Sequence, residues 1–194
     1  MCEPDEFTTP VNQLAHAMNR FNELLDVHRE LNELFFQHQR ALMRIEIDRA
    51  ETLLAEYSRN LLAHMQDEEE VMLPIYGERV KAPVGGAVDI FRTEHEKLRQ
   101  FLALFAEEIE KIRKMDDMER GVLFLIDSQH LFKRLLVHHD AREKKMLYPL
   151  LDQVTTHTER QEMFARLELP SALPKYESPN SERSRSHLGR LRLD

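Results

Sequence analysis

Two stretches of the sequence repeat one pattern of residues that bind metal ions. In each, a histidine is followed by a glutamate four residues later and a proline ten residues later: His64, Glu68 and Pro74, then His139, Glu143 and Pro149. On an α-helix, residues four apart lie about 40° apart around the axis and one turn apart along it. Such a histidine and glutamate therefore reach the same ion. One pair of this kind is weak evidence, and it is the repeat that makes the pattern informative.

The spacing of apolar residues predicts four long helices that position these pairs. We expect them at about 10–43, from 49 to a loosened end near Pro74, at 87–114, and from 117 to 151, with a short fifth helix after them. Residues that cap helices precede four of the five starts: Thr9 before Pro10, Asp48 with Glu51, Asp116 with Glu119, and Thr156 with Glu159. The fold class predicted is all-α, an antiparallel up-down-up-down four-helix bundle.

Each long helix carries one histidine on its apolar face: His28, His64, His95 and His139. His16 and His38 lie about 120° and 80° from His28 around the same helix, so we expect both on the surface. On the fourth helix, His138 is an alternative ligand, five residues before Glu143. We prefer its neighbour because that histidine repeats the distance to the following proline.

The same helical geometry gives the expected positions of residues near these histidines. The buried face of the fourth helix is expected to continue from Glu143 to Met146 and Leu150. Glu69 is about 140° from the second-helix histidine, which predicts a solvated acid facing sideways, and Glu94 is expected on the polar flank of the third helix. Tyr57, seven residues before His64, either supports a bound ligand with its phenol or is a core side chain, and we favour the core.

Four inward histidines and two inward carboxylates cannot satisfy one another at low cost, because a buried carboxylate without a partner is expensive. A pair of metal ions resolves this, with the carboxylates as bridges and two histidines on each ion. Imidazole and carboxylate donors suit iron, manganese or zinc rather than Cu(I). With a solvent-derived oxo or hydroxo bridge, each ion has about five donors and one open position. Geometry and composition alone do not separate di-iron from di-manganese, and a purely structural bundle is the competing hypothesis.

Composition narrows the class of protein. The 194-residue chain has a formal net charge of −8, which argues against a general nucleic-acid-binding surface. Cys2 is the only cysteine, so an intramolecular disulfide and a cysteine-based metal cluster are excluded. No apolar run is long enough for a membrane helix, and the acidic start is unlike a signal peptide, so we expect a cytoplasmic protein. The domain organisation expected is a flexible arm (1–9), the bundle (10–169) and a flexible tail rich in Ser, Pro and Arg (170–194).

The complete set of motifs resembles hemerythrin-like (HHE cation-binding) domains over roughly residues 11–152. The resemblance implies a non-haem di-iron centre that meets O2, NO or peroxide. It also implies roles for the six residues: His28, His64, His95 and His139 as terminal ligands, and Glu68 and Glu143 as bridging carboxylates.

This sequence departs from the oxygen-carrying members of that family. They have a second histidine one turn after the third-helix histidine, where this chain has Arg99, and an aspartate five residues after the fourth-helix histidine, where this chain has Glu143 after four. The ligand set is closer to the iron-sensing and iron-centre-repair members, which implies reactivity in oxidative or nitrosative stress or in iron-centre maintenance. Only about nine residues precede the first helix, whereas the repair proteins usually carry an N-terminal cysteine-bearing domain. The alternative function is an iron or oxygen sensor that acts through a protein partner bound by the tail.

Overall fold

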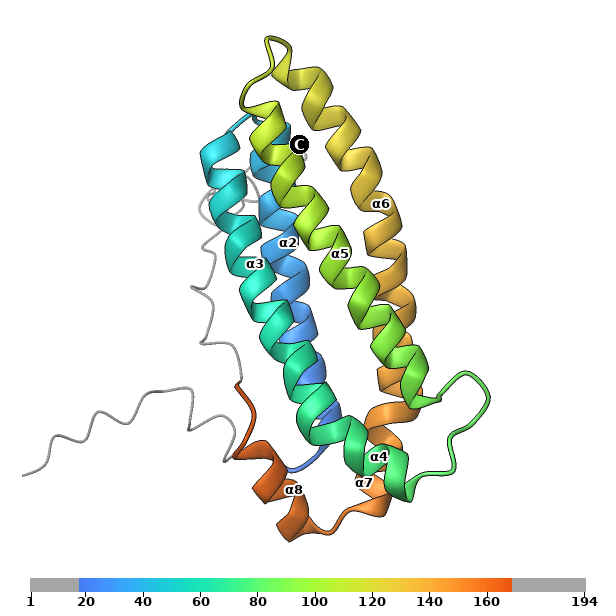
Figure 1. Cartoon of the computed structure of the whole chain (residues 1–194). Coiled ribbons are helices and arrows are strands. Elements are labelled where there is room, and N and C mark those ends of the chain that lie inside the picture. Colours follow the sequence, from blue (N-terminus) through green and yellow to red (C-terminus); the bar gives the residue numbers. More distant parts are fainter. Residues whose placement is uncertain (1–17, 169–194) are drawn as a thin grey trace, which may run out of the picture.

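Four long helices form an antiparallel bundle in the computed structural model, which describes residues 18–168 (Figure 1). They are α2 (Leu25–Met43), α3 (Ile47–Asp67), α5 (Val88–Ile112) and α6 (Met118–Arg142). Helices α2 and α5 each pack against both α3 and α6, so neighbours in sequence are neighbours in space. The described part of the chain contains no strand. The expected all-α bundle is confirmed.

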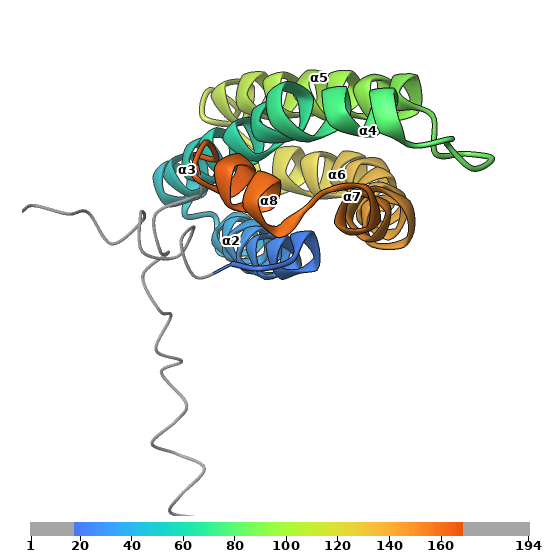
Figure 2. The same cartoon turned by 90° about the horizontal axis from the view of Figure 1, so that it is seen from below.

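Shorter elements close the lower end of the bundle in Figure 1. They are η1 (Phe21–Leu24), η2 (Glu68–Met72), α4 (Leu73–Arg79), η3 (Glu143–Leu147), α7 (Tyr148–Val154) and α8 (His157–Phe164). Helix α8 crosses beneath the bundle (Figure 2), where the ring of Phe164 packs 4.9 Å from that of Phe21. The fifth helix and its capping box are as predicted, because the Thr156 hydroxyl accepts from the Glu159 N–H at 3.2 Å. No helix within residues 18–168 is apolar over a length that would cross a membrane.

Both His-x3-Glu motifs run into a π-helical turn that starts at the glutamate. The N–H that closes each turn donates five residues back rather than four, from Leu73 to Glu68 and from Tyr148 to Glu143. A proline follows one residue later in both cases. Proline lacks an N–H and its ring collides with the carbonyl four residues earlier in an α-helix, so a wider turn accommodates it. The repeated proline therefore marks a repeated change of helix geometry.

Each π turn holds one extra residue and so shifts the buried face of the helix that follows. Continued α-helical periodicity after Glu143 predicted buried side chains at Met146 and Leu150, which are only partly buried. The fully buried residues are instead Leu147, Tyr148 and Leu151. This shift decides which side chains reach the interior beyond the glutamate.

The observed helices differ from the predicted ones at three places. Residues 18–20 are not helical, so the first helix does not run without a break from 10 to 43. The second begins at Ile47 without a side-chain cap, because the Asp48 carboxylate pairs with Arg113 instead. On α6 the capping carboxylate belongs to Asp117, which accepts from the Arg120 N–H at 3.0 Å. The predicted start at Thr9 and Pro10, the arm (1–9), His16 and the tail (170–194) lie outside the described residues.

His38, predicted on the surface, is completely buried. Its Nδ1–H donates to the carbonyl oxygen of Ala50 at 2.7 Å, and its Nε2 accepts from the side-chain amide of Gln129 at 2.9 Å. Because α2 packs against two other helices, its buried face is wide enough to include a residue 80° from His28. Burial lowers the pKa of His38 to about 4, against the opposing effect of its bond to the Ala50 carbonyl. The ring is therefore neutral near pH 7.

We expect His38 to make the fold sensitive to acid. Its pKa is lower in the folded chain than the ordinary value of 6.5, so the unfolded chain takes up the proton first as the pH falls. The excess stability of the wild type over His38→Gln should shrink by roughly 2–3 kcal/mol between pH 7 and pH 4.5. Urea unfolding across this range measures the difference, with exposed His130→Gln as the control. A difference that stays constant with pH would contradict this assignment.

Candidate metal centre

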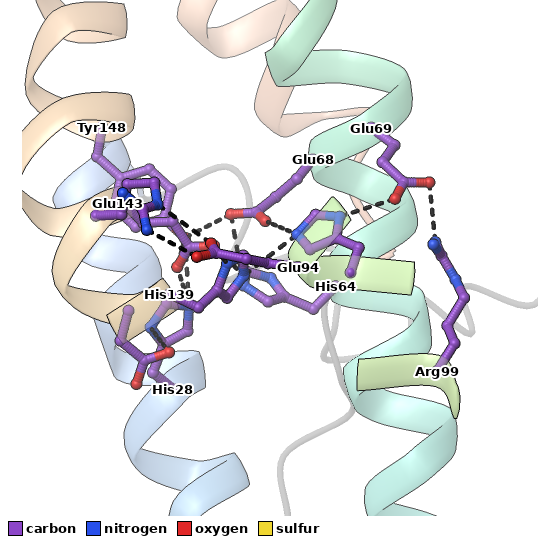
Figure 3. A network of polar contacts seen from close by, with 12 residues as sticks. His28, His64, Glu68, Glu69, Glu94, Arg99, His139, Glu143 and Tyr148 are labelled. Atoms are coloured by element: carbon purple, nitrogen blue, oxygen red, sulfur yellow. Dashed lines mark hydrogen bonds and ion pairs between the residues drawn. The ribbon is translucent and has the colours of Figure 1, made fainter. Parts of the chain in front are cut away.

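The alternating helix directions bring the four predicted histidines to one end of the bundle. His28 and His95 lie near the starts of α2 and α5, whereas His64 and His139 lie near the ends of α3 and α6. All four side chains are buried, while the alternative ligand His138 is exposed. The two glutamates stand one turn further along, at the first position of each π turn. Figure 3 shows the resulting cluster.

The histidines meet in two pairs. His28 Nε2 lies 2.8 Å from His64 Nε2, and His95 Nε2 lies 3.2 Å from His139 Nε2. Two nitrogen ligands at a right angle on one transition-metal ion, each roughly 2.1 Å from it, are about 3 Å apart. The spacing within each pair therefore fits two ligands of a shared cation.

Glu68 lies between the two histidine pairs. Its Oε2 is 3.2 Å from His95 Nε2, and its Oε1 is 3.7 Å from His64 Nε2. One carboxylate oxygen thus faces each pair.

Glu143 repeats this arrangement from the opposite side of the cluster. Its Oε1 is 2.6 Å from His139 Nε2, and its Oε2 is 3.3 Å from His28 Nε2. The donor atoms therefore form two groups, each suited to binding a cation, and Glu143 belongs to both. One group contains Glu68, His95, His139 and Glu143, and the other contains His28, His64 and Glu143. The structure therefore brings together all six predicted residues, and each carboxylate has one oxygen near each histidine pair.

Two of these donor atoms, Oε2 of Glu68 and Oε1 of Glu143, are buried without a hydrogen-bond partner. The far ring nitrogen of His28, Nδ1, also has none. Glu143 Oε1 is 2.6 Å from His139 Nε2, but the two atoms are not oriented for a hydrogen bond. A buried charged group without a donor costs more than the 1–3 kcal/mol of a neutral one. The orphaned oxygens therefore fit coordination of a cation better than a self-contained polar core.

Without a cation, the charges in the cluster compete. Burial lowers the pKa of His28 and of His64 to about 4, although Glu68 raises both, so these rings are neutral near pH 7. Burial and the negative charge of Glu68 raise the pKa of Glu143 well above its usual range. Burial also opposes ionisation of Glu68, but His64 and His95 outweigh it and lower the pKa of that carboxyl. Without metal, the two neighbouring carboxyl groups can coexist only if the cluster keeps protons. Bound cations would neutralise their negative charges instead.

Glu69 and Arg99 form an outer pair behind His95. The Nδ1–H of His95 donates to Glu69 Oε1 at 2.8 Å, and Arg99 Nη2 donates to Glu69 Oε2 at the same distance. Glu69 was predicted to be a solvated acid, which is wrong because the neighbouring helix α5 brings both partners to it. A carboxylate on the far nitrogen fixes the tautomer and orientation of a ligand histidine.

Glu94 and Arg142 form a matching pair behind His139. The Nδ1–H of His139 donates to Glu94 Oε2 at 3.1 Å, and Arg142 donates to both carboxylate oxygens, at 2.7 Å and 3.2 Å. Burial opposes ionisation, but these bonds lower the pKa of Glu94 to about 2. The predicted position on a polar flank is wrong: Glu94 is buried, because Arg142 from α6 covers and neutralises it.

In the pair formed by His28 and His64, His28 has no carboxylate bonded to its far ring nitrogen. The nearest carboxylate to its Nδ1 is that of Asp140, at 3.6 Å, and no hydrogen bond forms. Beside this pair lies a cavity of about 10 Å³, space for about one water molecule. Tyr57 lines the cavity, and its ring also packs 4.9 Å from Phe35, so it is both a core side chain and a neighbour of the cluster. The two halves of the centre are chemically unequal.

Tyr148 is the residue at the cluster that sequence reasoning missed. Its hydroxyl donates to Glu68 Oε1 at 2.8 Å and its side chain is completely buried. On a regular α-helix it would lie about 140° from Glu143, facing away. The π turn brings it to the same face. The sequence feature that could have pointed to Tyr148 is the alignment of the two motifs on their prolines, which pairs Tyr148 with Leu73.

Removal of one outer carboxylate should weaken metal binding without emptying the site. We expect Glu94→Gln to reduce affinity by about 10- to 100-fold, the usual cost of losing a partner of a ligand histidine. Competition with a chromophoric chelator measures the change. Glu96→Gln, an exposed position on the same helix, is the control and should bind as the wild type does. Equal affinities of Glu94→Gln and the wild type would contradict the role assigned to Glu94.

One comparison with known proteins matches this chain. A family model described as the hemerythrin HHE cation binding domain matches residues 19–151, a range that contains all six residues of the two histidine pairs and the carboxylates between them. No curated protein and no solved structure matches.

Proposed function

The chain belongs to the hemerythrin HHE cation-binding family, and on that premise we propose that it is a non-haem di-iron protein that binds or reduces a small oxidant. The oxidants considered are O2, nitric oxide and peroxide. The observation that carries the proposal is the position of Glu68 and Glu143, each with one oxygen at each histidine pair. A single cation would leave half of these donors unused.

The donor set and the family favour iron over manganese or zinc. Four imidazoles and two carboxylates suit iron, and the outer acids behind His95 and His139 strengthen those rings as donors. Bound iron would supply the electrons that reduce an oxidant. The protein residues hold the cations, orient the ligand rings through Glu69 and Glu94, and keep bulk water away.

The size of the opening supports a small ligand. The cavity beside His28 and His64 holds about one water molecule and is bordered by Leu31, Leu61 and Leu136. Asn32, Tyr57 and Asp140 also line the cavity, and its small volume suits a diatomic molecule or peroxide and excludes an organic substrate. A protein of this kind serves oxidative or nitrosative stress responses or iron-centre maintenance, and we propose a cytoplasmic location for it.

Spectroscopy of the iron-loaded protein tests this proposal. Protein from iron-replete cells should show the absorption of an oxo-bridged ferric pair, lose it on anaerobic reduction, and respond to nitric oxide or peroxide. The variant Glu68→Gln should lose these signals, whereas Glu70→Gln, exposed on the same π turn, should keep them. Protein that holds two zinc ions and shows no redox response would overturn the proposal.

A further inference from the structure

The hydroxyl of Tyr148 lies among the donor atoms of the His28 and His64 pair. It is 2.8 Å from Glu68 Oε1, 3.3 Å from His28 Nε2 and 3.4 Å from Glu143 Oε2. The phenol thus touches three of the atoms assigned above to metal binding. Figure 3 shows its ring directed into the cluster from the opposite side to Glu68.

These contacts complete a shell of five donors. Neighbouring atoms in the shell are separated by 2.8 Å to 3.7 Å, the range found between ligands of one first-row metal ion. The five atoms are His28 Nε2, His64 Nε2, Glu68 Oε1, Glu143 Oε2 and Tyr148 Oη.

We propose that the Tyr148 phenol oxygen is itself a ligand of the cation held by His28 and His64. The inference rests on the proposed di-iron function and adds a seventh protein ligand to the centre. On metal binding the O–H bond breaks, the proton passes to solvent, and the oxygen binds as phenolate. No oxidant or reductant takes part in this step.

The repeat shows that packing does not require this hydroxyl. The position equivalent to Tyr148 in the other motif is Leu73, which is buried to almost the same extent after the same π turn. An apolar side chain therefore fills the matching space in one half of the bundle. In the other half, the chain places a phenol where three donor atoms converge.

The two cations are then unequal in a defined way. The cation at His28 and His64 has five protein donors. The cation at His95 and His139 has four, because the matching position is a leucine. More free positions therefore remain on the second cation.

The test is the charge-transfer absorption that a phenolate gives with ferric iron in the visible region, together with the phenolate bands in resonance Raman spectra. The full-length ferric protein should show both, and Tyr148→Phe should lose both while keeping two irons per chain. Tyr76→Phe is the control, since Tyr76 is a buried tyrosine of α4 whose hydroxyl has no hydrogen-bond partner. Should Tyr148→Phe not fold, Tyr148→Leu reproduces the residue of the other repeat.

Each outcome is informative. A wild type that holds two irons without phenolate signals would overturn the role of Tyr148 and leave the di-iron function intact. Persistence of the signals in Tyr148→Phe would do the same. A wild type that binds no iron at all would overturn the di-iron function and this inference with it.

Discussion

Chelation of the metal should lower the free energy of unfolding by about 8 kcal/mol, if free iron exceeds the dissociation constant of each of two sites a thousandfold. The reason is that only the folded chain presents the complete set of donors. Anaerobic urea unfolding with ferrous iron, and again with excess chelator, measures the effect. Unfolding curves that coincide would show that the bundle is stable without cations.

The double variant His64→Leu, Glu68→Leu should lose the stabilisation by iron. It removes a buried carboxylate and an imidazole from a cluster that is poorly satisfied without metal, and apolar replacements of buried charges are often neutral or stabilising. We therefore expect the metal-free variant to be at least as stable as the metal-free wild type, and iron to add nothing to it. Glu70→Gln, on the same π turn, should respond to iron as the wild type does. A variant still stabilised by iron would contradict the ligand assignment.

Glu143→Gln should weaken binding of both cations so far that neither is retained. Glu143 contacts one histidine of each pair and is completely buried, and an amide is a weaker, neutral ligand. The loss of affinity should exceed the roughly 100-fold upper range for outer partners. Metal analysis after gel filtration measures the retained iron, with exposed Lys144→Gln as the control.

Intermediate results for Glu143→Gln have a clear meaning. One retained iron would show that the carboxylate serves only one cation and that the pairs are independent. Two retained irons would remove Glu143 from the centre. Either result would contradict a bridging role.

Periodicity and spacing were sufficient to predict the bundle and the convergence of six side chains. A histidine on the apolar face of each antiparallel helix must point inward, so agreement at His28, His64, His95 and His139 follows from helix geometry alone. The preference for His139 over His138 rested on the repeated proline, and the exposure of His138 agrees with it.

The residues that were missed depend on features that a regular helical wheel does not represent. Tyr148 enters the cluster only because a π turn adds one residue after Glu143. Glu69 was predicted to be a solvated acid and Glu94 to lie on a polar flank, but each is held by an arginine that helix packing brings near it. His38 was assigned to the surface because the wheel assumes a narrow buried face. Contacts between helices decided the positions of Glu69, Glu94 and His38, and the π turn decided that of Tyr148.

The central claim is that Glu68 and Glu143 join two cations, one at each histidine pair. Anomalous diffraction at the iron absorption edge, from crystals of protein loaded with iron, tests it most directly. We expect two peaks per chain, one between His28 and His64 and one between His95 and His139. A single peak, or peaks away from these residues, would contradict the claim.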